Sequence, residues 1–297
     1  MICGLLLLDK PEGLSSNAAL QRVRRLSGAD KAGHVGSLDP LATGMLPICL
    51  GEATKVASEM IGGRKRYRFT VALGAATATG DREGEIVERA AVPRLDPADI
   101  EAALARFRGR VRQVPPMYSA LKHQGQPLYR LARAGVEVER PPREIEIAEL
   151  TLRQREAAAF ELEALCSKGT YVRVLAQDIA RALGSCGHVS ALRRLYVEPF
   201  AESDLISLES LERQCLRGAP PQLLPPDAGL AHLPAVVLAG PAAERLAHGE
   251  SVAAPPSAAS GGVRIYDAQR RFMGLGEGDG EGRVRPRRLF VEPCEIP

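Results

Sequence analysis

Between residues 33 and 47 the chain reads GHVGSLDPLATGMLP, a stretch rich in glycine and proline. It shows little hydrophobic periodicity, and the whole segment from residue 29 to residue 47 is long for a loop in a compact domain. Long ordered loops usually carry function. Pro40 restricts the backbone of Asp39, so we expect the Asp39 carboxylate to be held in a fixed position. On this pattern alone, a turn or capping role for Asp39 is the alternative.

Regular elements are predicted on both sides of this segment. The apolar run from Ile2 to Leu8 indicates a buried strand, because it is too short to cross a bilayer and lacks the basic start of a signal peptide. Ser15 or Ser16 then caps a helix with apolar residues at helical spacing. Downstream, apolar and polar residues alternate from Tyr67 to Leu73, which predicts a strand.

The middle of the chain mixes strands and helices. The patterns predict strands at 84–87, 143–152 and 159–166, and helices at 97–107, with Asp96 as N-cap, and at 171–183, ending at Gly184. Because strands and helices do not alternate strictly, we expect an α/β or α+β core built on a mixed sheet.

The C-terminal part has a different character. The segment 217–226 contains Pro220, Pro221, Pro225 and Pro226 and predicts a linker. Beyond residue 233 we expect short strands broken by glycine and proline, at 235–238, 263–266, 272–276 and 283–291. This pattern is typical of a small β-barrel-like module. Its basic residues gather late, at Arg283, Arg285, Arg287 and Arg288, where they can contact phosphates.

The composition is that of an ordinary globular protein. The 297 residues suit one large domain and one small one, and 45% hydrophobic with 25% charged residues exclude a disordered or fibrous chain. A net charge of +3 is too small to indicate a nucleic-acid-binding protein by itself. However, Arg64, Lys65, Arg66 and Arg68 surround Tyr67. We predict a phosphate-facing patch there, with a solvated charged face as the alternative.

The cysteines do not indicate metal or disulfide chemistry. All 6 are scattered without a Cys-x-x-Cys pair, and the closest metal-like pairing is Cys186 with His188. We therefore predict neither a zinc site nor a disulfide framework. Together with the lack of a signal peptide pattern, this favours a reducing, cytoplasmic compartment.

The loop around Asp39 resembles the catalytic motif of the pseudouridine synthases, and in particular of the bacterial tRNA pseudouridine-55 synthases, the TruB family. The resemblance covers nearly the whole chain. It includes Asp9-Lys10-Pro11, Lys65-Arg66-Tyr67-Arg68, the stretch 115–122, the stretch 167–173, His188 with Leu192-Arg193-Arg194, Gly274-Leu275-Gly276, and Pro286-Arg287-Arg288. One departure is Thr77-Ala78-Thr79, where many members of the family carry an acidic residue between the threonines.

The resemblance implies a two-domain organisation. Residues 1–232 would form a catalytic domain of the pseudouridine synthase fold, with a central mixed, mainly antiparallel sheet. Residues 233–297 would form a PUA-like RNA-binding module. The segment 118–143, which contains Lys122 and Arg130, would be a thumb-like arm that closes on RNA, although a plain surface helix with flanking loops is the alternative on pattern alone.

The resemblance also implies the site residues. They are Asp39 as the catalytic aspartate, Arg173 as the arginine that pairs with it, and His34, Tyr67, Tyr171 and Leu192 as contacts of the substrate uridine. The Tyr67 ring would stack on the extruded uracil, and its hydroxyl could take part in the late removal of the C5 proton. Arg173 would keep Asp39 ionised, since a nearby opposite charge favours the charged form.

The implied reaction isomerises the uridine at position 55, in the T-loop of tRNA, to pseudouridine by detaching uracil from C1′ and reattaching it through carbon. It needs base flipping and a carboxylate, without net oxidation or hydrolysis. We therefore expect no metal, no organic cofactor, no obligate protein partner, no guide RNA and no membrane association. Whether Asp39 attacks the sugar or assists a glycal route stays open.

Three other interpretations are considered. A glycosidase-like enzyme would need a second carboxylate, and the candidate that follows the loop in sequence is Glu52, beyond an apolar stretch. A noncatalytic RNA-binding or RNA-folding protein is disfavoured by an intact set of Asp39, Tyr67 and Arg173. A guide-RNA-dependent pseudouridine synthase would need partner proteins, and the thumb-like arm favours a standalone enzyme.

Overall fold

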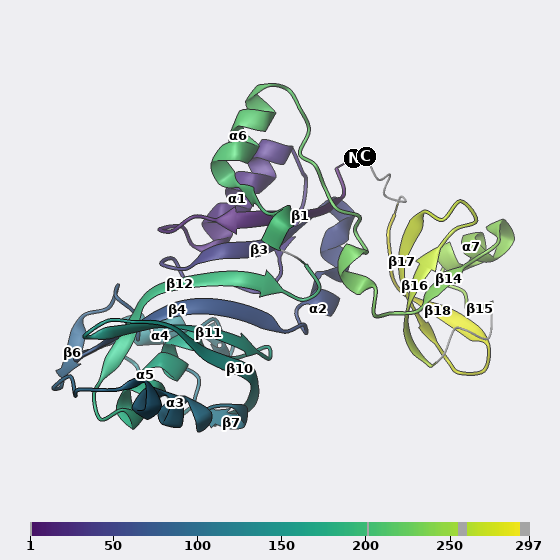
Figure 1. Ribbon diagram of the computed structural model, residues 1–297. Helices are drawn as coiled ribbons and strands as arrows, with labels where there is room; N and C mark the ends of the chain where they lie inside the picture. Colours follow the sequence, from purple (N-terminus) through teal and green to yellow (C-terminus); the bar gives the residue numbers. More distant parts are fainter. Residues whose placement is uncertain (1, 201, 255–259, 292–297) are drawn as a thin grey trace. The chain divides into compact units, whose positions relative to one another are not determined.

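The computed structural model describes residues 2–200, 202–254 and 260–291. The chain divides into two compact units, each built from segments far apart in sequence (Figure 1). The first unit comprises Met1–Pro40, Gly44–Gly62 and Glu198–Pro297, and the second comprises Leu41–Thr43 and Gly63–Val197. Within the described ranges, no helix is both long and apolar enough to cross a membrane.

The first unit is centred on strand β1 (Gly4–Lys10). It pairs antiparallel with β3 (Thr43–Leu50) on one side and parallel with β13 (Ile206–Ser207) on the other. Leu5 to Leu8 are all buried, so the continuous apolar run is a central strand covered on both faces. Helix α1 (Ser16–Ser27) packs beside α6 (Leu208–Leu216) (Figure 1).

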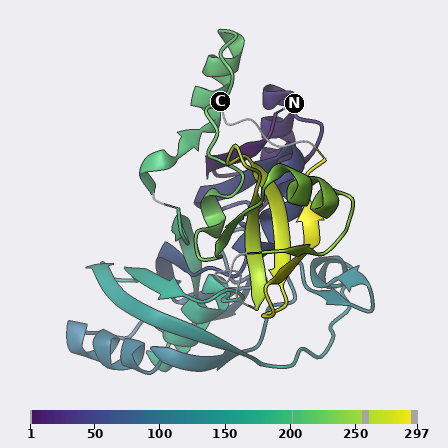
Figure 2. The ribbon, with the colours of Figure 1, turned by 90° about the vertical axis from the view of Figure 1, so that its right-hand side faces the viewer.

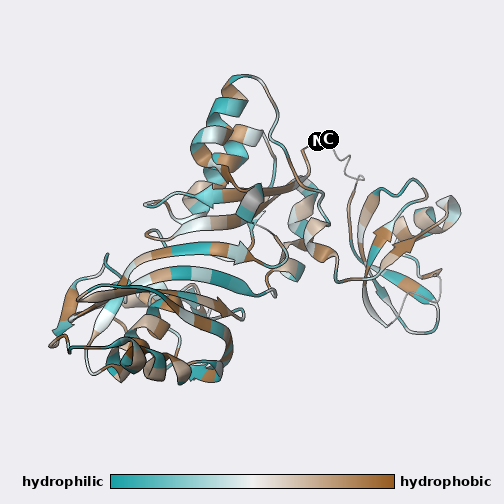
Figure 3. Cartoon of the chain, in the orientation of Figure 1, coloured by the Kyte–Doolittle hydropathy of each residue, from teal (hydrophilic) through white to brown (hydrophobic). Residues whose placement is uncertain are grey.

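The second unit contains an antiparallel sheet in the order β12-β4-β11-β10-β7. Its strands are β4 (Lys65–Leu73), β7 (Gly109–Gln113), β10 (Arg143–Arg155), β11 (Ala159–Cys166) and β12 (Gly187–Val197). Hydrophilic and hydrophobic residues alternate along β4, as Figure 3 shows, so Phe69 and Val71 are buried on one face of this strand.

Helix α5 (Val172–Ala182) packs on β4 and β12, and α3 (Pro97–Ala105) packs on β10 and on α5. The approach of α5 depends on Gly187, because a Cβ there would lie 2.7 Å from Ala180 Cβ and 2.8 Å from Ala72 O. Smaller elements of this unit are β5 (Ala75–Thr77), β6 (Ile86–Arg89), β8 (Lys122–His123), β9 (Gln126–Pro127) and α4 (Leu128–Arg133).

The predicted C-terminal module is confirmed as a curled five-stranded sheet in the order β14-β16-β17-β18-β15, in yellow and green in Figures 1 and 2. Its elements are β14 (Ala235–Val237), α7 (Gly240–Ala247), β15 (Val252–Ala253), β16 (Gly261–Tyr266), β17 (Phe272–Gly278) and β18 (Arg283–Leu289). Apolar side chains of α7 and the strands, including Val236, Leu246, Ile265 and Val284, form its own core.

Two predicted helix starts are confirmed in detail. The Ser15 side chain accepts a hydrogen bond from the Ala18 N–H at 3.1 Å, and Asp96 forms a capping box with Asp99. The cysteines differ from the expectation, since Cys3 is disulfide-bonded. Cys49, Cys166, Cys186 and Cys215 are free thiols, and Cys294 lies outside the described residues.

Candidate active site

Asp39 lies in the loop of a β-hairpin of the first unit. Strand β2 (Ala32–His34) pairs antiparallel with β3, in the register Ala32 to Leu50 and His34 to Ile48. The irregular segment is therefore shorter than the predicted 29–47, because the strands take both of its ends. His34 and Asp39 come from the same hairpin, and each is half-buried.

The backbone on both sides of Asp39 is held by groups near β1 and α1. The Ser16 hydroxyl donates to Leu38 O at 2.9 Å and accepts from Leu38 N–H at 2.7 Å. On the other side, Pro40 O accepts from Gly13 N–H at 2.9 Å and from the buried Lys10 ammonium at 3.3 Å. The carboxylate is thus carried on a braced turn, which is what a preorganised catalytic group requires.

Lys10 and Ser16 are functional candidates that residue patterns alone did not indicate. The Lys10 ammonium also donates to Pro11 O at 2.8 Å and to Leu14 O at 2.7 Å, so it holds three backbone carbonyls around the turn. Lys10 is fully buried, which is rare for a lysine, and this burial next to an irregular turn marks it as a structural support of the turn.

Tyr67 and Leu192 lie on neighbouring strands of the second unit. Tyr67 alternates with Arg66 and Arg68 along β4, so it shares the α5-facing side of the strand with the buried Phe69. Leu192 of β12 is paired in register with Phe69 and is also buried. Tyr67 and Leu192 are thereby brought to one face of the sheet, on which the buried Arg194 is paired in register with Tyr67.

Tyr171 is the N-cap residue of α5, and its backbone is fixed by a side chain from β7. The buried Gln113 amide accepts from Tyr171 N–H at 2.8 Å and donates to Tyr171 O at 3.1 Å. These two hydrogen bonds fix the backbone of Tyr171 and therefore the point from which its side chain projects. Gln113 is a third positioning candidate that the sequence patterns missed, since it lies 58 positions from its partner.

Arg173 is a buried residue of the second unit whose side chain contacts three separate positions of the chain. It donates to Thr79 O at 2.6 Å and to Tyr118 O at 2.8 Å, and its Nε lies 3.7 Å from a carboxylate oxygen of Asp81. Asp81 is itself buried and accepts from Glu83 N–H at 3.1 Å. Arg173 therefore ties the segment that follows β5 to the start of the predicted arm, and its pairing with Asp39 stays a prediction.

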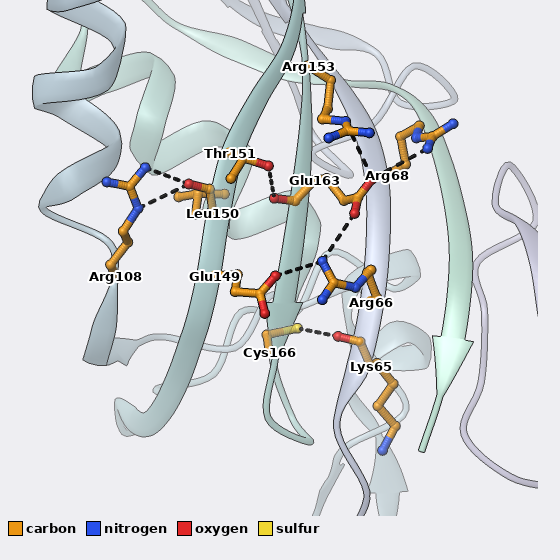
Figure 4. Close-up of polar contacts among 10 residues, drawn as sticks. All are labelled: Lys65, Arg66, Arg68, Arg108, Glu149, Leu150, Thr151, Arg153, Glu163 and Cys166. Carbon is orange, nitrogen blue, oxygen red and sulfur yellow. Dashed lines mark hydrogen bonds and ion pairs between the residues drawn. The ribbon is translucent and has the colours of Figure 1, made fainter. Parts of the chain in front are cut away.

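Two of the four basic residues predicted to form a phosphate-facing patch, Arg66 and Arg68, are engaged in ion pairs within the sheet. Arg66 and Arg68 project from the face of β4 opposite Tyr67 and pair with acidic residues of β10 and β11 (Figure 4). Arg66 lies 2.8 Å from Glu149 and 3.1 Å from Glu163, and Arg68 lies 3.4 Å from Glu163. The alternative, a solvated charged face, describes Arg66 and Arg68 better, since their side chains are 29% and 41% exposed, and ion pairs with Glu149 and Glu163 neutralise much of their charge.

Glu163 is the central acceptor of that face, because Arg153 also approaches it at 3.7 Å and its side chain is only 12% exposed. Removing its charge in Glu163→Gln leaves three arginines facing one another, so we expect a loss of about 1–3 kcal/mol in the free energy of unfolding. Urea unfolding measures this. Glu161→Gln is the control, since Glu161 is 35% exposed and 3.8 Å from Arg68. Equal losses in the two variants would contradict a central role for Glu163.

In the part of the chain that the structure describes, no group of three or more His, Cys, Asp or Glu side chains is arranged to hold a metal ion. His188, half of the metal-like pair in the sequence, has its Nδ1 2.8 Å from Ala75 O. The Cys186 thiol donates to Glu88 O at 3.7 Å.

Family models and sequence relatives of one kind match this chain over nearly its full length. The family described as "TruB family pseudouridylate synthase (N terminal domain)" matches residues 24–172, "tRNA pseudouridylate synthase B C-terminal domain" matches 173–226, and "Pseudouridine synthase II TruB, C-terminal" matches 234–290. The tRNA pseudouridine synthase B of Chromohalobacter salexigens is 51% identical over 97% of this chain and 94% of its own. That of Pseudomonas aeruginosa is 50% identical over 97% and 96%.

Solved structures support the fold. A Cbf5-Nop10-Gar1 complex contains a chain with a TM-score of 0.70 and 23% identity that covers 97% of this chain and 84% of its own. A chain in an H/ACA RNP bound to a substrate RNA has a TM-score of 0.73 and 21% identity and covers 99% and 87%. The sequence relatives, at about half identity over almost the full length, decide the family. The chain belongs to the TruB family of pseudouridine synthases.

Proposed function

We propose that this chain is a tRNA pseudouridine synthase, an isomerase that converts the T-loop uridine at tRNA position 55 to pseudouridine. The observation that carries the proposal is an aspartate, Asp39, on a turn braced from both sides, in a chain that matches the TruB family from residue 24 to residue 290. Relatives with the printed name tRNA pseudouridine synthase B support tRNA as the substrate.

In this proposal Asp39 supplies the carboxylate that breaks the bond between C1′ and N1, either by attack on the sugar or by assisting a glycal route. Arg173 supports the ionised aspartate. Tyr67 stacks on the extruded uracil, and Tyr171 and Leu192 complete the pocket that retains the free base. His34 occupies the space that the flipped nucleotide leaves.

The glycosidase-like alternative is disfavoured by the state of Glu52. Burial raises the pKa of Glu52, but hydrogen bonds from Lys55 and from Val291 N–H outweigh it and hold the pKa below its usual value. A glycosidase acid needs a raised pKa so that it can donate a proton. Glu52 is instead an ionised carboxylate, with Lys55 at 2.6 Å and Lys31 at 3.5 Å.

The division of labour is also proposed. Residues 1–232 perform the chemistry, the arm at 118–143 closes on the RNA, and the module at 233–297 binds it. The arm contains the hairpin β8-β9, whose turn residues Gln124 and Gly125 both have positive φ. We further propose that the enzyme acts in the cytoplasm on the T-arm stem-loop, without a guide RNA, protein partner or cofactor.

The direct test is carbodiimide mapping of pseudouridine in an unmodified tRNA transcript after incubation with the pure protein and no additive. We expect one new signal at position 55. A second transcript in which that uridine is replaced by cytidine serves as the control and should give none. If the first transcript gave no T-loop signal, the proposed function would be wrong.

Among the late arginines of the module, three have partners that reduce their availability to RNA. Arg283 donates to Ser251, Arg285 pairs with Glu277 at 3.1 Å, and Arg287 pairs with Glu59 at 3.0 Å. Arg288 is exposed, and no ion pair is found for it within the described ranges. Arg288 is therefore the best candidate of this group for a phosphate contact.

We expect Arg288→Gln to weaken tRNA binding and to reduce the slope of log affinity against log salt by about one. Filter binding at several salt concentrations measures both. Arg270→Gln, at an exposed arginine of the same module outside this group, is the matched control and should change the slope less. An unchanged slope in Arg288→Gln would show that the module does not use this residue to bind RNA.

A further inference from the structure

The open end of the hairpin that carries Asp39 is closed by an ionic cluster around one buried carboxylate, that of Glu52. Next to the register pair of Ala32 and Leu50, Gly51 N–H donates to Lys31 O at 2.9 Å. Glu52 follows in the 3-10 helix η1 (Gly51–Val56) and is only 7% exposed. Its carboxylate forms ion pairs with Lys55 at 2.6 Å and with Lys31 at 3.5 Å. One acidic group therefore links the residue that precedes β2 to the segment that follows β3.

The same cluster binds the end of the C-terminal module. Val291 N–H donates to Glu52 Oε2 at 2.9 Å, and the Lys55 ammonium donates to Leu289 O, at the end of β18, at 2.8 Å. We name Lys31, Glu52, Lys55, Leu289 and Val291 the Glu52 cluster. Its two module members are backbone groups, so the contact depends on the position of the chain and not on the type of side chain at 289 or 291.

Further contacts restrict this region. Gly51 has φ +59°, and a Cβ there would lie 2.1 Å from Ile2 O, so the backbone before β1 lies directly against the hairpin base. Arg287 of β18 pairs with Glu59 of helix α2 (Ala57–Met60) at 3.0 Å. The end of the module thus meets the segment 51–60 at several points along its length.

We infer that the C-terminal module acts on the chemical step as well as on RNA binding, because its residues Leu289 and Val291 complete the Glu52 cluster that fixes the base of the Asp39 hairpin. Glu52 and Lys55 are positioning residues: they act through the hairpin and do not touch the substrate. A buried carboxylate with two lysines and an N–H is costly to leave half-paired, so loss of one member displaces the others. The inference rests on the proposed function of Asp39.

The test uses the full chain with Lys55→Met, which keeps the aliphatic stem and removes the donor shared by Glu52 and Leu289 O. Since misplacement of a reacting group by about 1 Å costs on the order of 100-fold, we expect a loss of about 10-fold to 100-fold in the single-turnover rate of tritium release at saturating tRNA. The dissociation constant for tRNA should stay near that of the parent. Lys55→Arg, which keeps donors for both oxygens, should restore most of the rate.

The control is Arg271→Met, which breaks an ion pair of similar length inside the module, with Asp267 at 2.7 Å. It should leave the rate unchanged. Amide hydrogen exchange gives a second measurement: Lys55→Met should speed exchange in β2 and β3 more than in β4 and β12. A folded Lys55→Met protein with the parent rate, a loss confined to tRNA affinity, or equal acceleration of exchange throughout would overturn the inference. If the unsubstituted protein were itself inactive, the proposed function would be wrong. The hydrogen-exchange comparison would then still show whether the Glu52 cluster stabilises the Asp39 hairpin.

Discussion

Turnover of tRNA should fall by at least about a thousandfold in the Asp39→Asn variant, which corresponds to about 4 kcal/mol of activation free energy. Asparagine has nearly the shape of aspartate but lacks the negative charge and the nucleophilic oxygen. The turn is held through backbone groups of Leu38 and Pro40, which the substitution does not change. Affinity for tRNA should therefore persist while chemistry is lost.

Release of tritium from tRNA that contains 5-tritiated uridine measures the turnover of Asp39→Asn, and filter binding measures its affinity. Asp30→Asn is the matched control, because Asp30 is an exposed aspartate just before the same hairpin. It should retain the parent rate. If turnover in Asp39→Asn stayed within about tenfold of the parent, another residue would have to perform the chemistry.

Elements with clear local signals were predicted well. The strand β4, the helices α1 and α3 with their caps, and the strands of the C-terminal module all follow from alternation, helical spacing and turn residues. The residues that carry the proposed chemistry came from a different source, the resemblance to a family. Nothing in the local pattern around Leu192 or Tyr171 distinguishes them from core residues.

Strands β3 and β12 were missed for identifiable physical reasons. β3 is buried along almost its whole length and includes Pro47, so it neither alternates nor looks like a central strand. β12 contains Arg193 and Arg194 in succession, which hides its pattern, yet Arg194 is only 1% exposed. In both strands, burial decided by distant segments overrides the local signal.

The contacts that position the site were the least predictable part. Gln113 holds Tyr171 across 58 positions of sequence, and Val291 reaches Glu52 across 239. Conversely, residues that are neighbours in sequence can lie apart: Arg66 and Arg68 are on the face of β4 opposite Tyr67. The period of two therefore separates Tyr67 from the two arginines that flank it in sequence, and the ion pairs of Arg66 and Arg68 could not be predicted from the local pattern.

Tyr67→Phe should separate the late proton removal from the earlier steps. The phenyl ring still stacks on uracil, but the hydroxyl that we propose for removal of the C5 proton is gone. General acid–base groups contribute about 10²- to 10⁴-fold, so we expect tritium release to slow by that factor. Consumption of the original uridine, measured by nucleoside analysis in a single turnover, should be affected much less. Tyr67→Leu removes the ring as well and should slow both.

Tyr196→Phe is the control for the loss of a hydroxyl. Tyr196 lies on the neighbouring strand β12, in register with Arg66, and thus on the charged face away from Tyr67. It should release tritium at the parent rate. If Tyr67→Phe also matched the parent, the hydroxyl would have no part in proton transfer, and Tyr67 would serve only as a stacking surface. If uridine consumption and tritium release fell together in Tyr67→Phe, the hydroxyl would act before the glycosidic bond breaks, and the proposed order of steps would be wrong.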